Sequence, residues 1–184
     1  MVDMTEGELL AVSQAKAGDA EAWDTLLKRY RMPLYIYIFQ LVRSEQTSFD
    51  LVQETMMSAL RHIGTLQNEE KFGSWLFGIA HQKCIQLWRK QTREDDALKE
   101  LAEAPIDFED DPRGALIKRE QEAEFFRLLN ELPWPQRSVL VLYFVEDFSL
   151  DEIAGITGTP LGTVKSRLHY AKKTFRQLWK EKVV

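Results

Sequence analysis

Short polar and basic side chains gather near the C-terminal end of the sequence, where residues 160–184 hold seven basic groups and one acidic group. At helical spacing, the first turns of this segment present hydroxyl, amine and guanidinium groups. Such groups form hydrogen bonds with guanine acceptors in the major groove and with backbone phosphates. The segment therefore predicts a helix that reads DNA, and a solvated helix of no function is the alternative. The positions expected to be exposed are Thr163, Lys165, Ser166, Arg167, His169, Tyr170, Lys172, Lys173 and Arg176.

A second edge of amide and basic side chains is expected in the middle of the chain. It is formed at i, i+4, i+7 and i+11 by Gln82, Gln86, Arg89 and Arg93, with Lys83 and Lys90 nearby. Amides and guanidinium groups suit contacts to phosphates and base edges. The aromatic residues Phe72, Trp75 and Trp88 are either core side chains or platforms on which an unpaired base stacks. This segment is a second candidate for nucleic-acid binding.

An acidic and amide face is expected on the helix that precedes this edge. Its members, at i, i+3, i+4 and i+7, are Asp50, Gln53, Glu54 and Met57. Residues at this spacing share one side of a helix. Such a face is either simply solvated or the surface of a contact with another protein.

Charge is strongly segregated along an otherwise ordinary globular sequence. The 184 residues are 45% hydrophobic and 29% charged, with a net charge of −5. Residues 81–91 hold three basic and no acidic groups, whereas residues 92–113 hold three basic and nine acidic groups. Together with the basic C-terminal segment, this distribution favours two separate surfaces for a polyanion, joined by an acidic connector.

Several classes of protein are excluded by what the sequence lacks. Its apolar run from Pro33 to Phe39 is far shorter than the ~20 residues that span a bilayer, and the N-terminus has no secretory signal pattern. We therefore expect a cytoplasmic protein without membrane insertion. One cysteine, Cys84, expected to be a buried structural thiol, and three scattered histidines offer no disulfide and no metal-ligand spacing. Without a phosphate-binding glycine loop or a nucleophile arrangement, we expect no enzyme activity, metal, cofactor or small-molecule substrate.

Helical periodicity dominates the first half, and the sequence has no strand or hairpin pattern. Thr5 and Glu8 match a capping box, and Gly18-Asp19 ends that helix and starts the next. Pro33 either opens a new helix or kinks a continuous one. A helix over about residues 47–63 is expected to bury Val52, Thr55, Met56, Ala59, Leu60 and Ile63, and one over residues 71–91 to bury Phe72, Trp75, Leu76, Ile79 and Ala80.

The second half predicts a helix-turn-helix after a linker. Residues 92–113 lose the helical period and contain acidic runs and two prolines, which indicates a flexible acidic linker. Beyond it, helices are expected at about 113–130, 135–145, 149–157 and 160–181. Ser149 and Glu152 form a second capping box, and Gly158 permits the positive φ of a tight turn between two helices. The expected fold is all-α, with helical domains at residues 1–91 and 114–184.

These segments together resemble an extracytoplasmic-function sigma factor, the minimal class of the sigma-70 family. The string from Asp50 to Thr55, DLVQET, is similar to the family's core-binding helix, and that from Lys71 to Ala80, KFGSWLFGIA, is similar to its melting region. In the second domain, the matching strings are Leu132-Pro with Gln136-Arg137, Leu150 to Ala154, and Gly162 to Leu168. The resemblance covers nearly the whole chain.

The resemblance implies a factor that binds core RNA polymerase, directs it to the minus-35 and minus-10 promoter elements and promotes DNA melting. Contacts to the clamp helices of the largest polymerase subunit are implied for Asp50, Gln53, Glu54 and Met57. Minus-10 contacts are implied for Lys71, Phe72, Ser74, Trp75, His81, Gln82, Lys83, Gln86, Arg89 and Lys90. Minus-35 contacts are implied for Arg137, Pro160, Gly162, Thr163, Lys165, Ser166, Arg167, His169, Tyr170 and Lys173. An anti-sigma factor is a further implied partner.

The main alternative is a helix-turn-helix regulator that binds operators as a dimer without polymerase. It explains the second domain but leaves the aromatic and basic edge of the first domain, and its Asp50 face, without a role. A protein that only binds other proteins is a second alternative, and it predicts no dependence on DNA.

Overall fold

The computed structural model describes residues 5–98 and 118–183, and the regular elements within these ranges are all helices. The first domain consists of α1 (Glu6–Lys16), α2 (Ala20–Val42), α3 (Glu45–His62), the short 3-10 helices η1 (Ile63–Thr65) and η2 (Glu69–Lys71), and α4 (Phe72–Leu98). The second consists of α5 (Lys118–Leu129), α6 (Trp134–Phe144), α7 (Leu150–Thr157) and α8 (Leu161–Val183). The predicted all-α fold with two helical domains is confirmed.

Local sequence explains where the first helices begin and end. Thr5 caps α1, because its hydroxyl accepts the Glu8 N–H at 3.2 Å while the Glu8 carboxylate accepts the Thr5 N–H at 3.2 Å. Gly18 takes a φ of 93°, and the Asp19 carboxylate then caps α2. Pro33 lies inside α2, so the two alternatives for this residue resolve to one continuous helix.

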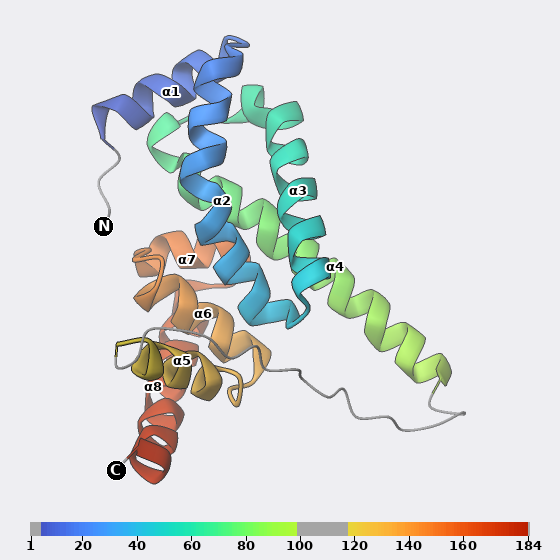
Figure 1. Ribbon diagram of the computed structural model, residues 1–184, viewed down its shortest axis with the longest axis vertical. Coiled ribbons are helices and arrows are strands. Elements are labelled where there is room, and N and C mark those ends of the chain that lie inside the picture. The colour runs from blue at the N-terminus through green and yellow to red at the C-terminus, as the bar shows by residue number, and fades with distance from the viewer. Residues whose placement is uncertain (1–4, 99–117, 184) are drawn as a thin grey trace.

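The first domain packs its four α-helices around one core. Helix α2 lies at its centre and contacts α1, α3 and α4, while α3 also packs on α4 (Figure 1). The largest fully buried side chains of this domain include Tyr37, Phe72 and Phe77. Cys84 is buried as expected, and its burial raises the pKa of the thiol to about 12.

Two expectations for the first domain are wrong. Leu60 is 51% exposed rather than part of the core, because at 100° per residue it lies about 80° from Val52, at the margin of the buried stripe. Helix α4 does not end at residue 91 but continues to Leu98, and this end projects away from the other helices (Figure 1). Residues 92–98 contain no glycine or proline that would end a helix. The rest of the expected linker, residues 99–113, lies outside the described residues.

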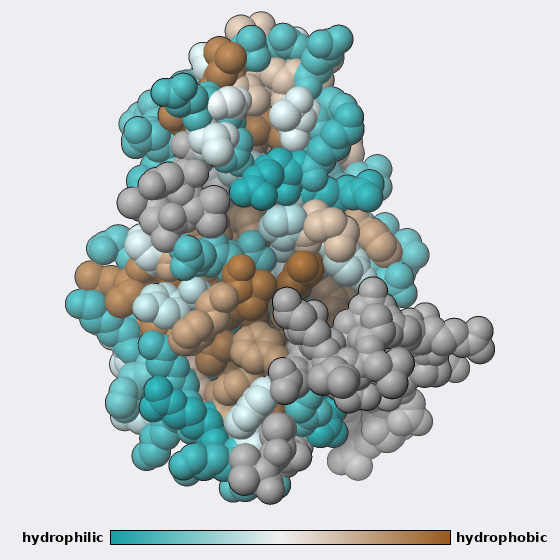
Figure 2. All heavy atoms as spheres, turned by 60° about the vertical axis from the view of Figure 1, so that its left-hand side comes forward, coloured by the Kyte–Doolittle hydropathy of each residue, from teal (hydrophilic) through white to brown (hydrophobic). Residues whose placement is uncertain are grey.

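The second domain packs directly against the first. Within it, α8 contacts α5, α6 and α7, and across the boundary α7 lies on α4 and α6 lies on α2. The buried residues of both domains therefore form one hydrophobic cluster. On the face shown in Figure 2, hydrophilic side chains cover most of the upper half, and apolar side chains gather in the lower half. None of the helices in the described ranges combines the length and the hydrophobicity needed to cross a membrane.

Candidate nucleic-acid interface

Helices α7 and α8 form the expected helix-turn-helix. The Ser149 hydroxyl accepts the Glu152 N–H at 3.3 Å, and the Glu152 carboxylate accepts the Ser149 N–H at 3.0 Å. This capping box starts α7 at Leu150. Gly158 ends α7 in the left-handed conformation, with a φ of 60°, and α8 begins three residues later at Leu161. The short turn fixes the orientation of α8 relative to α7. This orientation decides which residues of α8 are exposed to solvent.

Helix α8 has a buried line and a broad polar surface. Val164, Leu168 and Ala171 are buried against the second domain. Seven of the expected minus-35 residues are exposed, namely Pro160, Gly162, Lys165, Ser166, His169, Tyr170 and Lys173, whereas Thr163 and Arg167 are half-buried. Along the same helix, a shallow hollow of about 320 Å³ is lined by His169, Lys172, Lys173, Arg176, Gln177 and Lys180. The exposed surface of α8 therefore suits a polyanion.

Arg137 differs from the other expected minus-35 residues because it is only 5% exposed. Its guanidinium donates to the Asn130 carbonyl at 3.3 Å and lies near Arg43 of α2. Burial, with a smaller contribution from the Arg43 charge, lowers the pKa of Arg137 to about 10. In this arrangement Arg137 is therefore a structural residue at the contact between the two domains.

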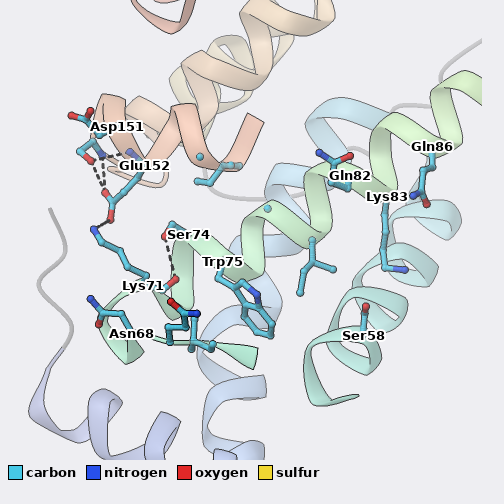
Figure 3. A pocket seen from close by; sticks show the side chains of 17 residues that line it. Ser58, Asn68, Lys71, Ser74, Trp75, Gln82, Lys83, Gln86, Asp151 and Glu152 are labelled. Carbon is cyan, nitrogen blue, oxygen red and sulfur yellow. Dashed lines mark hydrogen bonds and ion pairs between the residues drawn. The ribbon is translucent and has the colours of Figure 1, made fainter. Parts of the chain in front are cut away.

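A groove of about 880 Å³ runs along α4 and is walled on one side by α7 (Figure 3). Lys71 and Ser74 lie at its start, where the Lys71 ammonium contacts the Glu152 carboxylate at 3.0 Å and the Ser74 hydroxyl donates to the Lys71 carbonyl at 3.1 Å. Trp75 is half-buried and borders the same groove (Figure 3). Lys83 lies further along and contacts Glu54 of α3 at 3.3 Å. One groove thus holds apolar, aromatic, basic and acidic side chains from both domains.

The remaining expected minus-10 residues divide into exposed and buried groups. The exposed group is Gln82, Gln86, Arg89 and Lys90. Phe72 is 1% exposed, because its ring packs on Tyr30 with centroids 5.3 Å apart and on Trp75 at 5.9 Å. Of the two readings for the aromatic residues, the core reading holds for Phe72 in this structure, whereas Trp88 is exposed.

His81 is buried in the boundary between the domains rather than lying on an exposed edge. It is 2% exposed, its Nδ1 lies 2.6 Å from the Tyr37 hydroxyl, and its ring lies 5.2 Å from that of Trp134 in α6. Burial, with a smaller effect of the Arg167 charge, lowers the pKa of His81 to about 4. The sequence analysis missed Tyr37 and Trp134 as partners of His81, and only the unusual Pro-Trp-Pro string at 133–135 marks Trp134 as notable.

The face of α3 that was expected to contact another protein is exposed. Asp50, Gln53 and Glu54 are in solvent, and Met57 is 47% exposed. Two aromatic residues adjoin this face, Phe49 of α3 and Tyr35 of α2. Phe49 is exposed and stacks on Tyr35 of α2, with ring centroids 4.7 Å apart. An exposed apolar cluster with an acidic border is typical of a protein contact.

Comparison with known proteins matches both domains to one family. The family description of sigma-70 region 2 matches residues 26–94, and that of sigma-70 region 4 matches residues 122–175. The RNA polymerase sigma factor SigV of Bacillus subtilis is 32% identical over 85% of this chain and 91% of its own length. The chain belongs to the sigma-70 family, as an extracytoplasmic-function sigma factor. The main reading of the sequence is thereby confirmed over the operator-binding alternative.

Other relatives of this sigma factor agree with the assignment. The extracytoplasmic-function sigma factor SigW of Bacillus subtilis is 26% identical over 90% of this chain and 93% of its own length. The solved structure of the sigma factor RpoE of Bartonella quintana, in complex with the anti-sigma factor NepR, is similar in fold with a TM-score of 0.73. It is 25% identical and covers 88% of this chain and 98% of its own. Region 2 thus holds the α3 face and the groove along α4, and region 4 holds the helix-turn-helix.

Proposed function

We propose that this sigma factor binds core RNA polymerase through α3, reads the minus-35 element with α8 and holds the melted minus-10 element along α4. The observation that supports this division most strongly is the placement of three exposed surfaces of different chemistry on one chain. The apolar and acidic face lies on α3, the amide and basic edge lies on α4, and the basic surface lies on α8.

Minus-35 reading is assigned to the first turns of α8. Lys165 and Ser166 are exposed there and match groups that bond guanine acceptors or phosphates. His169 and Lys173 follow one and two turns later on the exposed surface and suit the phosphate backbone. Base edges would then be read near the N-terminus of the helix, and the later turns would fix its register on the duplex.

Minus-10 capture is assigned to the groove along α4. Melting needs no catalytic group, because unstacking a base costs a few kcal/mol and stacking on a ring with pocket contacts offsets it. Trp75 borders this groove with amide and basic side chains on either side of it. An unpaired base would stack on Trp75, while Gln82 and Gln86 contact neighbouring edges and Arg89 contacts phosphate.

Polymerase binding is assigned to the exposed face of α3. Met57 and Phe49 supply apolar area, and Asp50 and Glu54 supply negative charge at its border. We assign this face to the clamp helices of the largest polymerase subunit. An anti-sigma factor is a further proposed partner, since the Bartonella relative was solved with one. The protein would act in the cytoplasm, where polymerase is, and would have no enzyme activity of its own.

The direct test is run-off transcription from a pool of genomic fragments with core polymerase, with and without this protein, followed by sequencing of RNA 5′ ends. New start sites that share two upstream motifs at fixed spacing are expected. Absence of new starts despite demonstrated polymerase binding would leave a protein that only binds other proteins. DNA binding at one operator without polymerase would instead favour a regulator.

The α3 assignment is tested with two matched methionine variants. Met57 and Met32 are 47% and 52% exposed on helices α3 and α2. Because burial of a methionine side chain contributes about 1.5–3 kcal/mol, Met57→Ser should weaken polymerase binding about tenfold or more in a competition assay, and Met32→Ser should not. Equal affinities for the two variants would remove the α3 face from the proposal.

A further inference from the structure

Helix α1 has no part in the three surfaces of the proposed function, although region 2 holds it firmly. Val12 and Ala15 of α1 are buried in the core, and α1 packs along α2. The Glu8 carboxylate of α1 also contacts the Arg29 guanidinium of α2 at 3.0 Å. A buried stripe and an ion pair therefore fix α1 in place, and with it the position of Lys16 in its last turn.

Lys16 reaches from α1 to the segment that joins α3 to α4. Its ammonium group donates to the Leu66 carbonyl at 2.9 Å and to the Glu69 carboxylate at 2.6 Å. The side chains of Lys16 and Glu69 are 25% and 35% exposed, so water and salt screen this ion pair less than one on the open surface. We call these two bonds the Lys16 contact. They join one firmly held helix to two points on the chain three residues apart, and so restrain the chain between them.

The restrained segment forms one end of the groove along α4. We name residues 66–71 the groove loop, because four of its members, Leu66, Gln67, Asn68 and Lys71, line that groove (Figure 3). Leu66 is 6% exposed and anchors the loop in the core, whereas Gln67 and Asn68 are exposed. Exposed amide groups suit base edges. The position of the loop therefore decides whether these groups reach a strand in the groove.

Short 3-10 turns give the groove loop little stiffness of its own. The Leu66 N–H donates to the Ile63 carbonyl at 3.1 Å, and the Lys71 N–H donates to the Asn68 carbonyl at 3.0 Å. Such bonds between residues three apart have poorer geometry than those of an α-helix, and runs of them are short. A binding site keeps its shape only where neighbouring contacts lock the groups that form it. The Lys16 contact supplies such a lock from outside the loop.

Two simpler roles for Lys16 make different predictions. A lysine in the last turn of a helix interacts favourably with the helix dipole, and a lysine near nucleic acid attracts phosphate. Neither role needs the Glu69 carboxylate, which would only repel a DNA strand. Lys16 is not among the described residues that line the groove, and its ammonium group is engaged by Leu66 and Glu69. The geometry therefore favours an effect of Lys16 on the loop over an effect on the DNA.

We propose that Lys16 is a positioning residue for capture of the minus-10 strand: from α1 it holds the groove loop in the arrangement that receives the unpaired strand. The proposal rests on the proposed function of the groove. Lys16 acts through Leu66 and Glu69, and not on a base or a phosphate. Without the Lys16 contact the loop takes several arrangements, and the apparent affinity for the strand falls by the fraction of molecules in which the loop fits.

The first test follows the groove loop without DNA. Amide hydrogen exchange of the full chain, read by mass spectrometry of its peptides, is compared for the parent, Lys16→Met and Lys28→Met. Lys28 is the matched control, because it forms an exposed ion pair with Asp24 on α2. Peptides over residues 66–71 should exchange at least about tenfold faster in Lys16→Met and at the parent rate in Lys28→Met. Equal exchange in all three proteins would overturn the proposal, whatever the groove binds.

The second test measures capture of the strand by the complex with core polymerase. The run-off experiment supplies the minus-10 sequence, and the probe is a fluorescein-labelled single strand of about 12 nucleotides with that sequence. A scrambled strand of the same composition is measured beside it, and both are read by fluorescence anisotropy. Lys16→Met should bind the minus-10 strand at least about tenfold more weakly than the parent does and should bind the scrambled strand equally. Equal losses for both strands would indicate a phosphate contact and would overturn the proposal.

Two carboxylate variants separate positioning from simple charge. Glu69→Ala removes an acceptor of the Lys16 contact, whereas Glu70→Ala removes the same charge from the next residue, which is exposed. Charge alone predicts tighter DNA binding for both variants. We expect Glu69→Ala to bind the minus-10 strand more weakly than the parent, and the double variant Lys16→Met/Glu69→Ala to bind as Lys16→Met does, because both changes remove one contact. Equal binding by Glu69→Ala and Glu70→Ala, or additive losses in the double variant, would overturn the proposal.

Two readouts keep this proposal apart from general damage to region 2 and from failure of the proposed function. The affinity of Lys16→Met for core polymerase should equal that of the parent, because the α3 face is untouched. A parallel fall in the affinities for polymerase and strand would show general damage and would overturn the proposal. If the groove does not receive the strand, Trp75→Ala binds it as tightly as the parent does. That result would overturn the proposed function, and hydrogen exchange would still decide whether Lys16 holds the loop.

Discussion

Two titratable groups of this sigma factor should have opposite effects on how its stability depends on pH. Burial against Tyr37 and Trp134, with a smaller effect of the Arg167 charge, lowers the pKa of His81 to about 4. Glu146 has its pKa raised to about 7 by burial, with Arg29 opposing the shift. It lies in a hollow that Glu8, Arg29, Tyr30, Glu70, Asp147 and Glu152 also line. We therefore expect acid to act on the folded chain through both groups at once.

The directions follow from which state binds the proton more tightly. Unfolded His81 takes up a proton near pH 6.5 while the folded chain resists it, so stability is lost as the pH falls from 6.5 towards 4. Folded Glu146 keeps its proton up to about pH 7 while the unfolded chain releases it near 4.5, so stability is gained as the pH falls through this range. Between pH 8 and pH 5, each group changes the free energy of unfolding by about 2 to 3 kcal/mol. His81 lowers it and Glu146 raises it as the pH falls.

The assay is urea unfolding of the full chain at pH 8, 7, 6 and 5. In the parent chain, these two groups together should change the free energy of unfolding by no more than about 1 kcal/mol over this range, because their effects offset each other. In Glu146→Gln only His81 of the pair still titrates, so the free energy of unfolding should fall by about 2 kcal/mol between pH 8 and pH 5. In His81→Asn only Glu146 still titrates, so the free energy of unfolding should rise by about 2 to 3 kcal/mol. A level profile for Glu146→Gln, or a parent chain that falls as steeply as that variant, would refute the reasoning.

Three further outcomes are expected. Phe77→Ala removes a ring that packs on Phe148 and on region 2, and should lower the free energy of unfolding by about 3 to 5 kcal/mol in urea; a loss below about 1 kcal/mol would mean that the site is not packed as described. Ser149→Ala removes the cap of α7 and should cost about 1 kcal/mol in the same assay, whereas an unchanged midpoint would show the cap to be dispensable. Lys165→Ala should lower the salt dependence of minus-35 DNA binding by about one unit of slope, and Lys28→Ala, a control on exposed α2, should not.

The starts of α1 and α7 and the end of α7 were predictable because the signals are local. A capping box needs only two residues three apart, and both of them, at Thr5 and Ser149, form as expected. Gly158 takes the left-handed conformation that a turn of this kind requires. The fold class followed from these signals and from the 3.6-residue period. No signal of this kind depends on what the chain does elsewhere.

The errors came where a local pattern is ambiguous or incomplete. Leu60 lies at the margin of its stripe, where 100° steps alone do not separate core from solvent. The last turns of α4 carry no apolar period, and absence of that period was read as absence of helix, although charged residues also form helices well. The place of Pro33 was left open because a proline is accommodated in the first turn of a new helix and can also lie inside a helix that it kinks.

Two of the expected site residues, His81 and Arg137, are buried at the contact between the domains, which sequence reasoning did not predict. Both have the chemistry of DNA-binding side chains. His81 is covered by Trp134, and Arg137 donates to the Asn130 carbonyl, to which Arg43 of the other domain also donates. A helical pattern shows that a residue faces outward from its own domain. It does not show whether a second domain covers that face.

The order in which a ribosome makes the chain bears on the residues of α4 that contact Phe148 and α7. About 50 residues separate the end of α4 from the start of α7, and at about 5–20 residues per second they take several seconds to synthesise. During that interval this side of α4 has no partner, and a wholly apolar surface would invite association with other nascent chains. Gly73 and Gly78 carry no apolar side chain and His81 is polar, so on this side of α4 Phe77 is the large apolar side chain that waits for Phe148. Region 2 can thus emerge first and remain dispersed until region 4 arrives.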